Sequence, residues 1–429
     1  MNKKLIGLGM LVAANSAFAQ TSGSSVELYG ILDVAVGHVE NSLTADGNFP
    51  NTVSVLSATS ATGVPNSVTG MINGGIQGSR WGIRGSEDLG GGLKAIFTLE
   101  SGFNGQDGVV SNAAASLAAN PSKGVTTTSS NSSLDGQLFN RQAWVGLSDA
   151  SLGTITFGRN YNPIYDIAVD YDPVQDAQLF SPLGVSSTIG GGGGVSEDTR
   201  LDNSIKYKNT IGAFNFGGLY KLGGVAGSTS AESGYVLNLG YEDGPFGIKA
   251  AYSNFTDALK TGATAGTVGG TVSATNYDAT AFFIAAKYNF GNFNLKGGYE
   301  TYTLKAPSDL LTTANVSSVF GYTLSALTNF ASADQTTDVW FVGGDYSFTP
   351  ALNLALGFYD QNPKQSNDLK QHDGNIYSYS ALLDYHFTKR TDVYTGWLYS
   401  QYKGDQYTLP VANDNSSNYV FAVGIRTKF

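Results

Sequence analysis

The sequence predicts an all-β fold, a transmembrane antiparallel barrel of sixteen strands with short periplasmic turns and long extracellular loops. Three observations lead to this prediction: an amphipathic strand at the carboxyl terminus, an export signal at the amino terminus, and a composition rich in aromatic residues and glycine but poor in charge. Together they indicate an exported chain that crosses lipid as strands, because only helices and closed barrels satisfy their backbone polar groups in hydrocarbon.

The carboxyl-terminal segment Asn418–Phe429 alternates between two kinds of side chain. From Tyr419 onward every second residue is large and apolar, except Thr427, and the chain ends on an aromatic residue. The intervening residues are small or polar, with Val420 as the one apolar member. Because successive side chains of a strand point to opposite faces, this pattern predicts lipid on one face and water on the other.

The amino terminus has the features of a secretory signal peptide, predicted over residues 1–19. Lys3 and Lys4 precede an uncharged stretch that ends in Ala17-Phe18-Ala19, a small-x-small cleavage site. We expect the mature chain to form one barrel domain over residues 20–429. Its apolar runs fall far short of the ~20 residues of a helical span, so the periplasm, the medium and the outer membrane are the possible destinations.

Composition favours the outer membrane among these destinations. The chain has 24 Tyr, 23 Phe and 55 Gly, and only 14% of its residues are charged, as expected of strands that touch lipid between aromatic girdles. The absence of Cys excludes a disulfide scaffold. Without Lys3 and Lys4, the 24 basic residues become 22 against 34 acidic ones, a net charge of −12 that argues against nucleic acid as a partner.

Sixteen alternating segments are separated by connections that are short and long in strict alternation, so that all turns meet at one rim and all loops at the other. The predicted strands are Ser25–His38, Ile76–Glu87, Leu93–Phe103, Phe139–Leu147, Thr154–Arg159, Leu201–Asn209, Ala213–Lys221, Ser233–Tyr241, Gly247–Phe255, Tyr277–Asn289, Phe293–Thr303, Thr337–Tyr346, Ala351–Asp360, Ile376–His386, Thr391–Gln401 and Asn418–Phe429. The predicted long loops are Val39–Gly75, Asn104–Leu138, Asn160–Arg200, Leu222–Glu232, Thr256–Asn276, Leu304–Thr336, Gln361–Asn375 and Tyr402–Ser417.

Five motifs along the mature chain are specific when taken in order. They are Val26-Glu-Leu-Tyr-Gly30, the segment from Ser79 to Ala95 that includes Arg84-Gly-Ser-Glu-Asp-Leu-Gly-Gly-Gly92, Arg141-Gln-Ala-Trp-Val-Gly-Leu147, Phe157-Gly-Arg-Asn-Tyr161 and the final Phe429. In these motifs the chain resembles the general-diffusion porins of Gram-negative bacteria, most closely the neisserial and betaproteobacterial branch.

The resemblance implies a homotrimer in the outer membrane, surrounded by lipid and lipopolysaccharide. Each barrel would hold a water-filled pore, narrowed by the third loop, for passive, size-limited passage of small hydrophilic solutes and ions. In the family, acidic groups on this loop oppose arginines on the facing wall. Here the third loop is Asn160–Arg200; its candidate constriction residues are Asp166, Asp170, Asp172, Asp176, Tyr161 and Tyr165, although the family's Pro-Glu-Phe-Gly-Gly tip is missing.

Periodicity supplies candidates for the basic wall. Arg80 and Arg84 share one face of a strand while Trp81 and Ile83 occupy the other. An arginine facing lipid near the midplane would cost about 2–4 kcal/mol, so the inward assignment is favoured. By similar reasoning Arg141 alternates with an outward Trp144, and Arg159 lies two residues before Tyr161. Arg200 closes the third loop, at a place where the resemblance implies an arginine. The five arginines are predicted to line the pore opposite the loop acids, producing a transverse field.

Several alternatives stay open. The charges could serve only as salt bridges that hold the loop, and the tyrosines Tyr161, Tyr165 and Tyr171 would suit a substrate-specific channel. An outer-membrane enzyme would need a Ser and a His together, and none of His38, His372 and His386 has an obvious partner. No cofactor or metal site is predicted, although a divalent cation could bind the loop acids Glu197, Asp198, Asp405 and Asp414.

Overall fold

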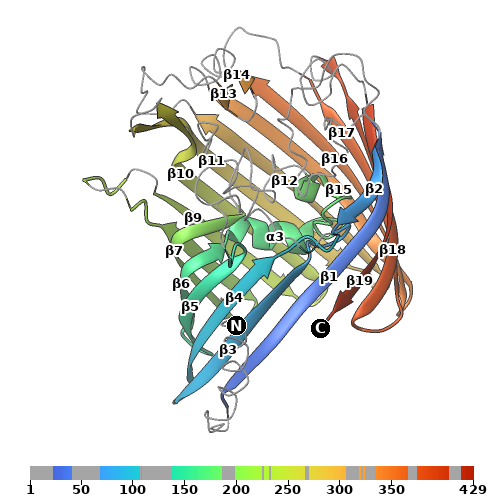
Figure 1. Ribbon diagram of the computed structural model, residues 1–429. Helices are drawn as coiled ribbons and strands as arrows, with labels where there is room; N and C mark the ends of the chain where they lie inside the picture. The colour runs from blue at the N-terminus through green and yellow to red at the C-terminus, as the bar shows by residue number, and fades with distance from the viewer. Residues whose placement is uncertain are drawn as a thin grey trace, which may run out of the picture.

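In the computed structural model the chain is a β-barrel with a helical segment inside it (Figure 1). The structure describes residues 23–40, 68–106, 108, 138–185, 199–224, 227–230, 233–265, 270–305, 318–319, 322–323, 334–365, 374–404 and 417–429. The wall strands are β1 (Ser25–Glu40), β2 (Val68–Asn73), β3 (Arg80–Gly90), β4 (Leu93–Gly102), β5 (Gln142–Asp149), β6 (Gly153–Tyr161), β7 (Arg200–Ile211), β8 (Phe214–Lys221), β9 (Gly234–Asp243), β10 (Phe246–Ala265), β11 (Gly270–Asn289), β12 (Phe293–Lys305), β15 (Gln335–Thr349), β16 (Leu352–Gln365), β17 (Ile376–His386), β18 (Thr391–Tyr402) and β19 (Ser417–Lys428).

Three shorter features, two helices and one hairpin, are not part of the barrel wall. The helices α3 (Pro163–Tyr171) and α4 (Pro182–Val185) belong to the third loop, and β13 (Ser318–Val319) pairs with β14 (Tyr322–Thr323) in the sixth. None of the helices within the described residues is long and apolar enough to cross a bilayer.

The barrel closes through the first and last strands. One edge of β1 pairs with β19, and the other edge pairs with β3 in its first half and with β2 in its second half. Thus β2 and β3 are two pieces of one wall strand, interrupted over residues 74–79, and the seventeen pieces of the sheet occupy sixteen positions. The predicted sixteen-stranded antiparallel barrel is confirmed.

The carboxyl-terminal strand has the predicted two faces. Phe421 and Ile425 are about half exposed on the outer surface, whereas Ala422 and Arg426 are buried inside. Phe429 extends the closure, since its backbone N–H and C=O each bond with Gly30 at 3.0 Å. Gly30 leaves the space for this contact, because a Cβ there would lie 2.2 Å from the Phe429 ring.

Several predicted boundaries are wrong, and the first is the predicted loop Val39–Gly75, in which Val68–Asn73 form β2. The predicted loop Thr256–Asn276 is mostly strand: β10 and β11 continue as a twenty-residue pair, with register shifts just after Phe255. Residues 256–276 show no sustained apolar period of two, so the pattern that located the other strands was missing there. The predicted second strand begins too early, because residues 76–79 belong to the interruption before β3.

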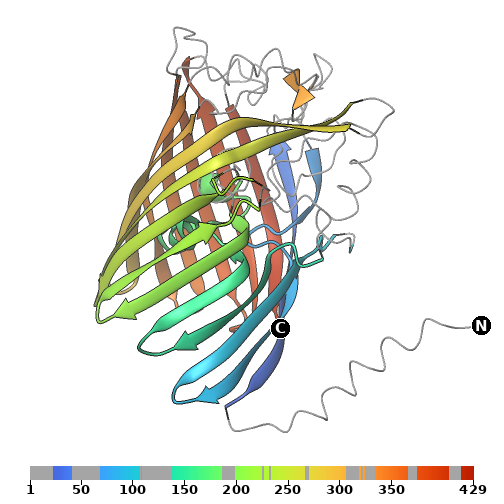
Figure 2. The same cartoon turned by 90° about the vertical axis from the view of Figure 1, so that its left-hand side faces the viewer.

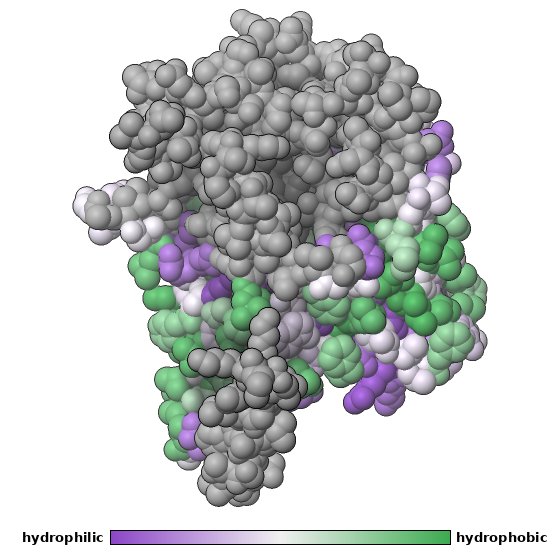
Figure 3. Space-filling view, viewed as in Figure 1, coloured by the Kyte–Doolittle hydropathy of each residue, from purple (hydrophilic) through white to green (hydrophobic). Residues whose placement is uncertain are grey.

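On the face shown in Figure 3, the barrel wall carries large apolar patches interspersed with polar residues. Strands β3 to β9 stop near the level of α3, whereas β10 to β12 and β15 to β18 continue toward the loop rim (Figures 1 and 2). The wall is therefore lower on one side of the barrel than on the other.

The third loop fills much of the interior. Its first part packs through Ile164, Ile167 and Tyr171 against apolar side chains of β7 to β12, β15 and β16. Its second part packs through Val174, Ala177 and Phe180 against β1, β2 and β16 to β19. Strands β3 to β6 contribute to neither cluster, so the open space must lie on their side.

Replacing Phe180 by alanine should destabilise the barrel by about 3–5 kcal/mol, because this fully buried ring packs over Gly396 and would leave a cavity. Urea unfolding in detergent, followed by intrinsic fluorescence, measures the loss. Phe348→Ala is the matched control, since that ring is 54% exposed near a turn, and its loss should be much smaller. Equal losses in the two variants would contradict the assigned packing.

Candidate functional site

A cavity of about 1280 Å³ runs between the third loop and strands β3 to β10. None of the described lining residues comes from β11 to β19, because the apolar side of the third loop covers that part of the wall. The cavity is therefore off centre in the barrel. We call this space the lumen cavity.

Two arginines bracket a buried carboxylate on the wall of the lumen cavity. Arg141 Nε donates to Glu100 Oε1 at 2.7 Å, and Arg80 Nε lies 3.8 Å from Glu100 Oε2. Tyr29 and Tyr161 also donate their hydroxyls to Glu100, at 2.9 and 3.2 Å. The Glu100 side chain is only 5% exposed, so these partners replace the water that its charge has lost. Arg80 and Arg141 are 17% and 13% exposed.

Two third-loop tyrosines form a flat surface beside this cluster. The rings of Tyr161 and Tyr165 stack with centroids 5.0 Å apart and planes inclined by 19°. The guanidinium carbons of Arg141 and Arg200 lie 5.9 and 5.3 Å from the centre of the Tyr161 ring. This tyrosine shelf combines π faces with positive charge, an arrangement that favours cation–π attraction.

Two acids of the third loop pair with lysines rather than with the arginines. Asp166 and Asp170, one turn apart on α3, bind Lys206 of β7 and Lys249 of β10, the second pair at 3.2 Å. Lys249 also contacts Glu242 at 3.2 Å. The lysines lie on the wall next to α3, so these charges neutralise one another locally.

The other two loop acids have different environments. Asp172 is fully buried, where it accepts hydrogen bonds from the Tyr359 hydroxyl at 2.5 Å and the Asp176 amide at 2.6 Å. Burial raises the pKa of the Asp172 carboxyl above its usual value. Asp176 lines the lumen cavity, and burial together with the nearby Asp172 charge raises the pKa of its carboxyl well above the usual range.

Two predicted wall arginines lie outside the lumen cavity. Arg84 pairs with Glu27 at 2.8 Å toward the turn rim, and both side chains are 56% exposed. Arg159 is buried, donating to Asp202 at 2.6 Å and to the Asn140 carbonyl at 2.9 Å. Gly158, at φ +134°, precedes a register shift in β6, so residues beyond it no longer follow the alternation that the prediction assumed.

The structure thus brings together Arg80, Arg141, Arg200, Tyr161, Tyr165, Asp166, Asp170 and Asp176 around one cavity, while Asp172 is embedded behind it. Sequence reasoning missed Glu100, Lys206 and Lys249. Their inward alternation with outward Leu99, Ile205 and Ile248 was a usable signal. The prediction from alternation that Trp144 faces outward is wrong. In the structure Trp144 pairs with Thr98 in β4 and lines the lumen cavity.

Among the described residues, one group has metal-ligand composition: Asp384, His386 and Asp392. Arg426 already contacts both carboxylates, at 3.6 and 3.1 Å, so the group is a salt-bridge network at the turn end of the lumen. The candidate cation ligands Glu197, Asp198, Asp405 and Asp414, and His372, lie outside the described residues.

Comparison with known proteins gives consistent matches. The sequence profile described as Gram-negative porin matches residues 7–405. An outer membrane porin protein of Bordetella pertussis is 31% identical over 270 residues, which is 59% of each chain and so less than two thirds of that relative. Outer membrane porin protein 32 of Delftia acidovorans is 30% identical over 307 residues, 69% of this chain and 68% of the relative.

Solved structures share the fold over almost the full length. The anion-selective porin from Comamonas acidovorans has a TM-score of 0.63 at 22% identity, covering 95% of this chain and 100% of that one. The trimer form of OmpT from Vibrio cholerae has a TM-score of 0.59 at 15% identity, covering 95% and 99%. At such identities the likeness concerns the fold.

Replacing Glu100 by alanine should cost about 3–5 kcal/mol of folding stability, because two poorly exposed guanidinium groups would lose their carboxylate. Glu27→Ala, which breaks the exposed pair with Arg84, should cost only about 0–1 kcal/mol. Thermal unfolding of both variants in detergent provides the comparison. If Glu100→Ala were as mild as Glu27→Ala, the cluster would not be a buried ion pair.

Proposed function

Because the chain belongs to the Gram-negative porin family, we propose that it is a general-diffusion porin of the outer membrane. It is a channel and not an enzyme: small hydrophilic solutes and ions pass through it without any reaction. The observation that carries this proposal is the lumen cavity, a space lined by charged residues inside a barrel whose outer face exposes many large apolar side chains. Residues 1–19 are its export signal, and lipid and lipopolysaccharide surround the wall.

The lumen cavity acts as the constriction. Its lining contains the basic residues Arg80, Arg141, Arg200, Lys206, Lys208 and Lys249, and the acidic residues Glu100, Asp166, Asp170, Asp176 and Glu242. Charges of both signs on facing walls produce a transverse field that orients dipolar solutes. Among the described lining residues cations outnumber anions by one, so the constriction weakly prefers anions. The Comamonas neighbour is itself named as anion-selective.

The outer surface supports assembly into a homotrimer. Among the described residues between Val26 and Phe157, eleven large apolar side chains are exposed and only Phe157 is aromatic, whereas among those described from Tyr207 to Trp397 seventeen of 25 are aromatic. Barrels that face lipid all round carry aromatic girdles, so we assign the face of β1 to β6 to neighbouring copies of this chain. That face includes the low part of the wall (Figure 2).

One observation favours a second candidate function, a substrate-specific channel. The tyrosine shelf, flanked by Arg141 and Arg200, would suit a planar anionic solute. Flux that saturates with solute concentration would support this alternative, whereas flux proportional to concentration supports general diffusion.

Replacing Arg80 by glutamine should shift the reversal potential in a salt gradient toward cation preference, because a constriction charge is removed. Arg84→Gln is the matched control on the same strand, four residues away and outside the lumen cavity, and should leave the potential nearly unchanged. Both are measured with single channels in planar bilayers. A wild-type protein that inserts without conducting would overturn the function itself, and equal shifts would remove Arg80 from the constriction.

Anion preference should increase as pH falls through a window above the ordinary aspartate pKa of about 3.9. The reason is the raised pKa of Asp176, whose protonation removes a negative charge from the lining. Reversal potentials recorded across this window should show the step in the wild type and not in Asp176→Asn. A step of the same size in that variant would assign it to another group.

Val145→Arg, which places a charge on the face assigned to neighbouring copies, should convert trimers to monomers. Leu356→Arg, at a comparably exposed position on β16 outside that face, serves as the control and should remain trimeric. Light scattering in detergent gives the mass of each assembly. Trimers in both variants would show that β1 to β6 do not form the interface.

A further inference from the structure

The interruption between β2 and β3 is the most unusual feature of the wall. Residues 74–79 leave the sheet between Asn73 and Arg80, although both flanking pieces pair with the same edge of β1. Gly74 starts the departure with a φ of +79°, a conformation that favours glycine. We call residues 74–79 the strand break.

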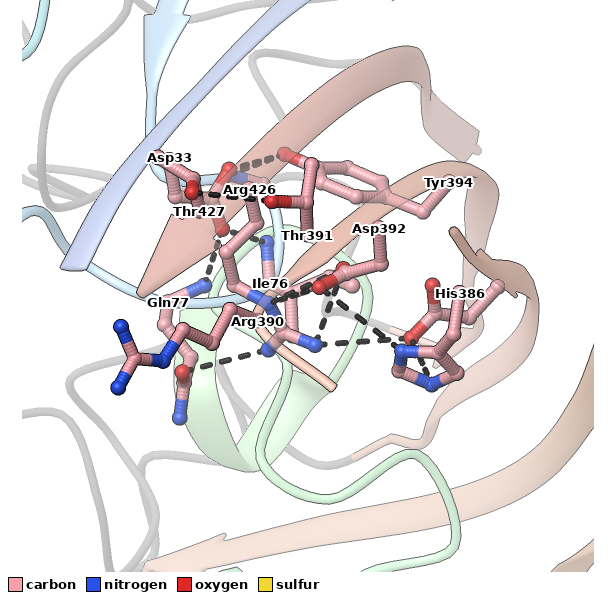
Figure 4. A network of polar contacts seen from close by, with 12 residues as sticks. Asp33, Ile76, Gln77, His386, Arg390, Thr391, Asp392, Tyr394, Arg426 and Thr427 are labelled. Carbon is pink, nitrogen blue, oxygen red and sulfur yellow. Dashed lines mark hydrogen bonds and ion pairs between the residues drawn. The ribbon is translucent and has the colours of Figure 1, made fainter. Parts of the chain in front are cut away.

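A single buried carboxylate holds the strand break in place (Figure 4). Asp33 of β1 is 0% exposed, and its Oδ1 accepts from the Gly75 amide at 3.2 Å. Its Oδ2 accepts from the amides of Ile76 and Gln77 at 3.1 and 2.8 Å. The N–H groups of Gly75, Ile76 and Gln77, which no longer pair within the sheet, thus donate to a carboxylate. Hydrogen bonds to a charged acceptor belong to the strong class.

The last two strands, β18 and β19, contact Asp33 and the strand break from the other side. The Tyr394 hydroxyl of β18 donates to Asp33 Oδ1 and accepts from the Gly75 amide at 3.0 Å. Arg426 of β19 donates to the Gln77 side chain at 3.2 Å. The break is therefore fixed between the first strand and the last two.

The strand break in turn contacts both sides of the constriction. Toward the third loop, the carbonyls of Ile76 and Gly75 accept from the amides of Gln178 and Leu179 at 2.9 and 3.0 Å. Toward the basic wall, the Gly78 carbonyl accepts from Arg80 Nη1 at 3.3 Å. The strand break thus forms hydrogen bonds both with the third loop and with Arg80 on the opposite wall.

We propose that Asp33 is a positioning residue for the constriction: through the strand break, its carboxylate sets the third loop and Arg80 at a fixed separation. The effect on transport rests on the proposed channel function, whereas the effect on the loop does not. An amide at this position could not accept from all three N–H groups, and its NH₂ would face the donors of the break.

Asp33→Asn tests the proposal. Compared with the wild type, its single channels should show larger and noisier conductance and a reversal potential with weaker anion preference, because Arg80 loses its anchor. The matched control is Asp345→Asn, which alters another buried carboxylate that faces the barrel interior and accepts hydrogen bonds from Asn294 and Asn353. It should conduct as the wild type does.

A second readout follows the loop without any current. The chain has no cysteine, so Gln178→Cys introduces a single thiol. This thiol should react faster with a water-soluble maleimide in the Asp33→Asn background, while unfolding temperatures of the Asp33→Asn and Asp345→Asn proteins stay similar. A role confined to stability would lower the unfolding temperature and leave the labelling rate unchanged.

A covalent link between the strand break and the third loop distinguishes a positioning role of Asp33 from a general loss of structure. A Cβ on Gly78 would lie 4.0 Å from Gln178 Cδ, so Gly78→Cys with Gln178→Cys places two thiols on facing segments, within reach of a short bifunctional methanethiosulfonate. Cross-linking should restore quiet channels to Asp33→Asn, and reduction of the cross-link should abolish the rescue. If Asp33→Asn does not fold, Tyr394→Phe, which removes one donor to the carboxylate, should give a weaker effect of the same sign. Wild-type conductance and labelling in whichever variant folds would overturn the proposal.

Discussion

The structure depends on one constraint: a backbone N–H or C=O in hydrocarbon has only another strand to bond. The constraint explains why β1 must meet β19 and why the chain continues to the paired backbone of Gly30 and Phe429. It also explains the treatment of the strand break. Amides that leave the sheet at Gly75, Ile76 and Gln77 lose their neighbours, so Asp33 replaces the missing strand as acceptor.

Inside the wall, the polar groups follow a related rule, since a charge with little access to water requires a partner. Glu100 is shared by Arg80 and Arg141, and Asp166 and Asp170 are matched by Lys206 and Lys249. Most of these charges therefore stabilise the fold as pairs. The transverse field that we propose for the lumen cavity is what remains after these pairs are formed.

Most of the wall could be predicted from the sequence, because lipid on one face and water on the other imposes a period of two. Asn418–Phe429 and Ile376–His386 are examples in which the pattern located the strand to within about a residue. The rest depends on tertiary contacts. The break at residues 74–79 is set by Asp33, forty residues earlier, and Arg159 left the predicted wall because Gly158 shifts the register. The third-loop acids were found by position, but their lysine partners come from β7 and β10.

The division of α3 into two faces affects how the pore can change over evolution. Ile164, Ile167 and Tyr171 hold the helix on the wall, whereas Tyr165, Asp166 and Asp170 border the solute route. Substitutions on the second face can alter the sieve without disturbing the anchor or any lipid-facing residue. A lineage could therefore adapt its nutrient uptake, or exclude a toxic compound, through a few codons of one helix while the membrane-spanning scaffold stays the same.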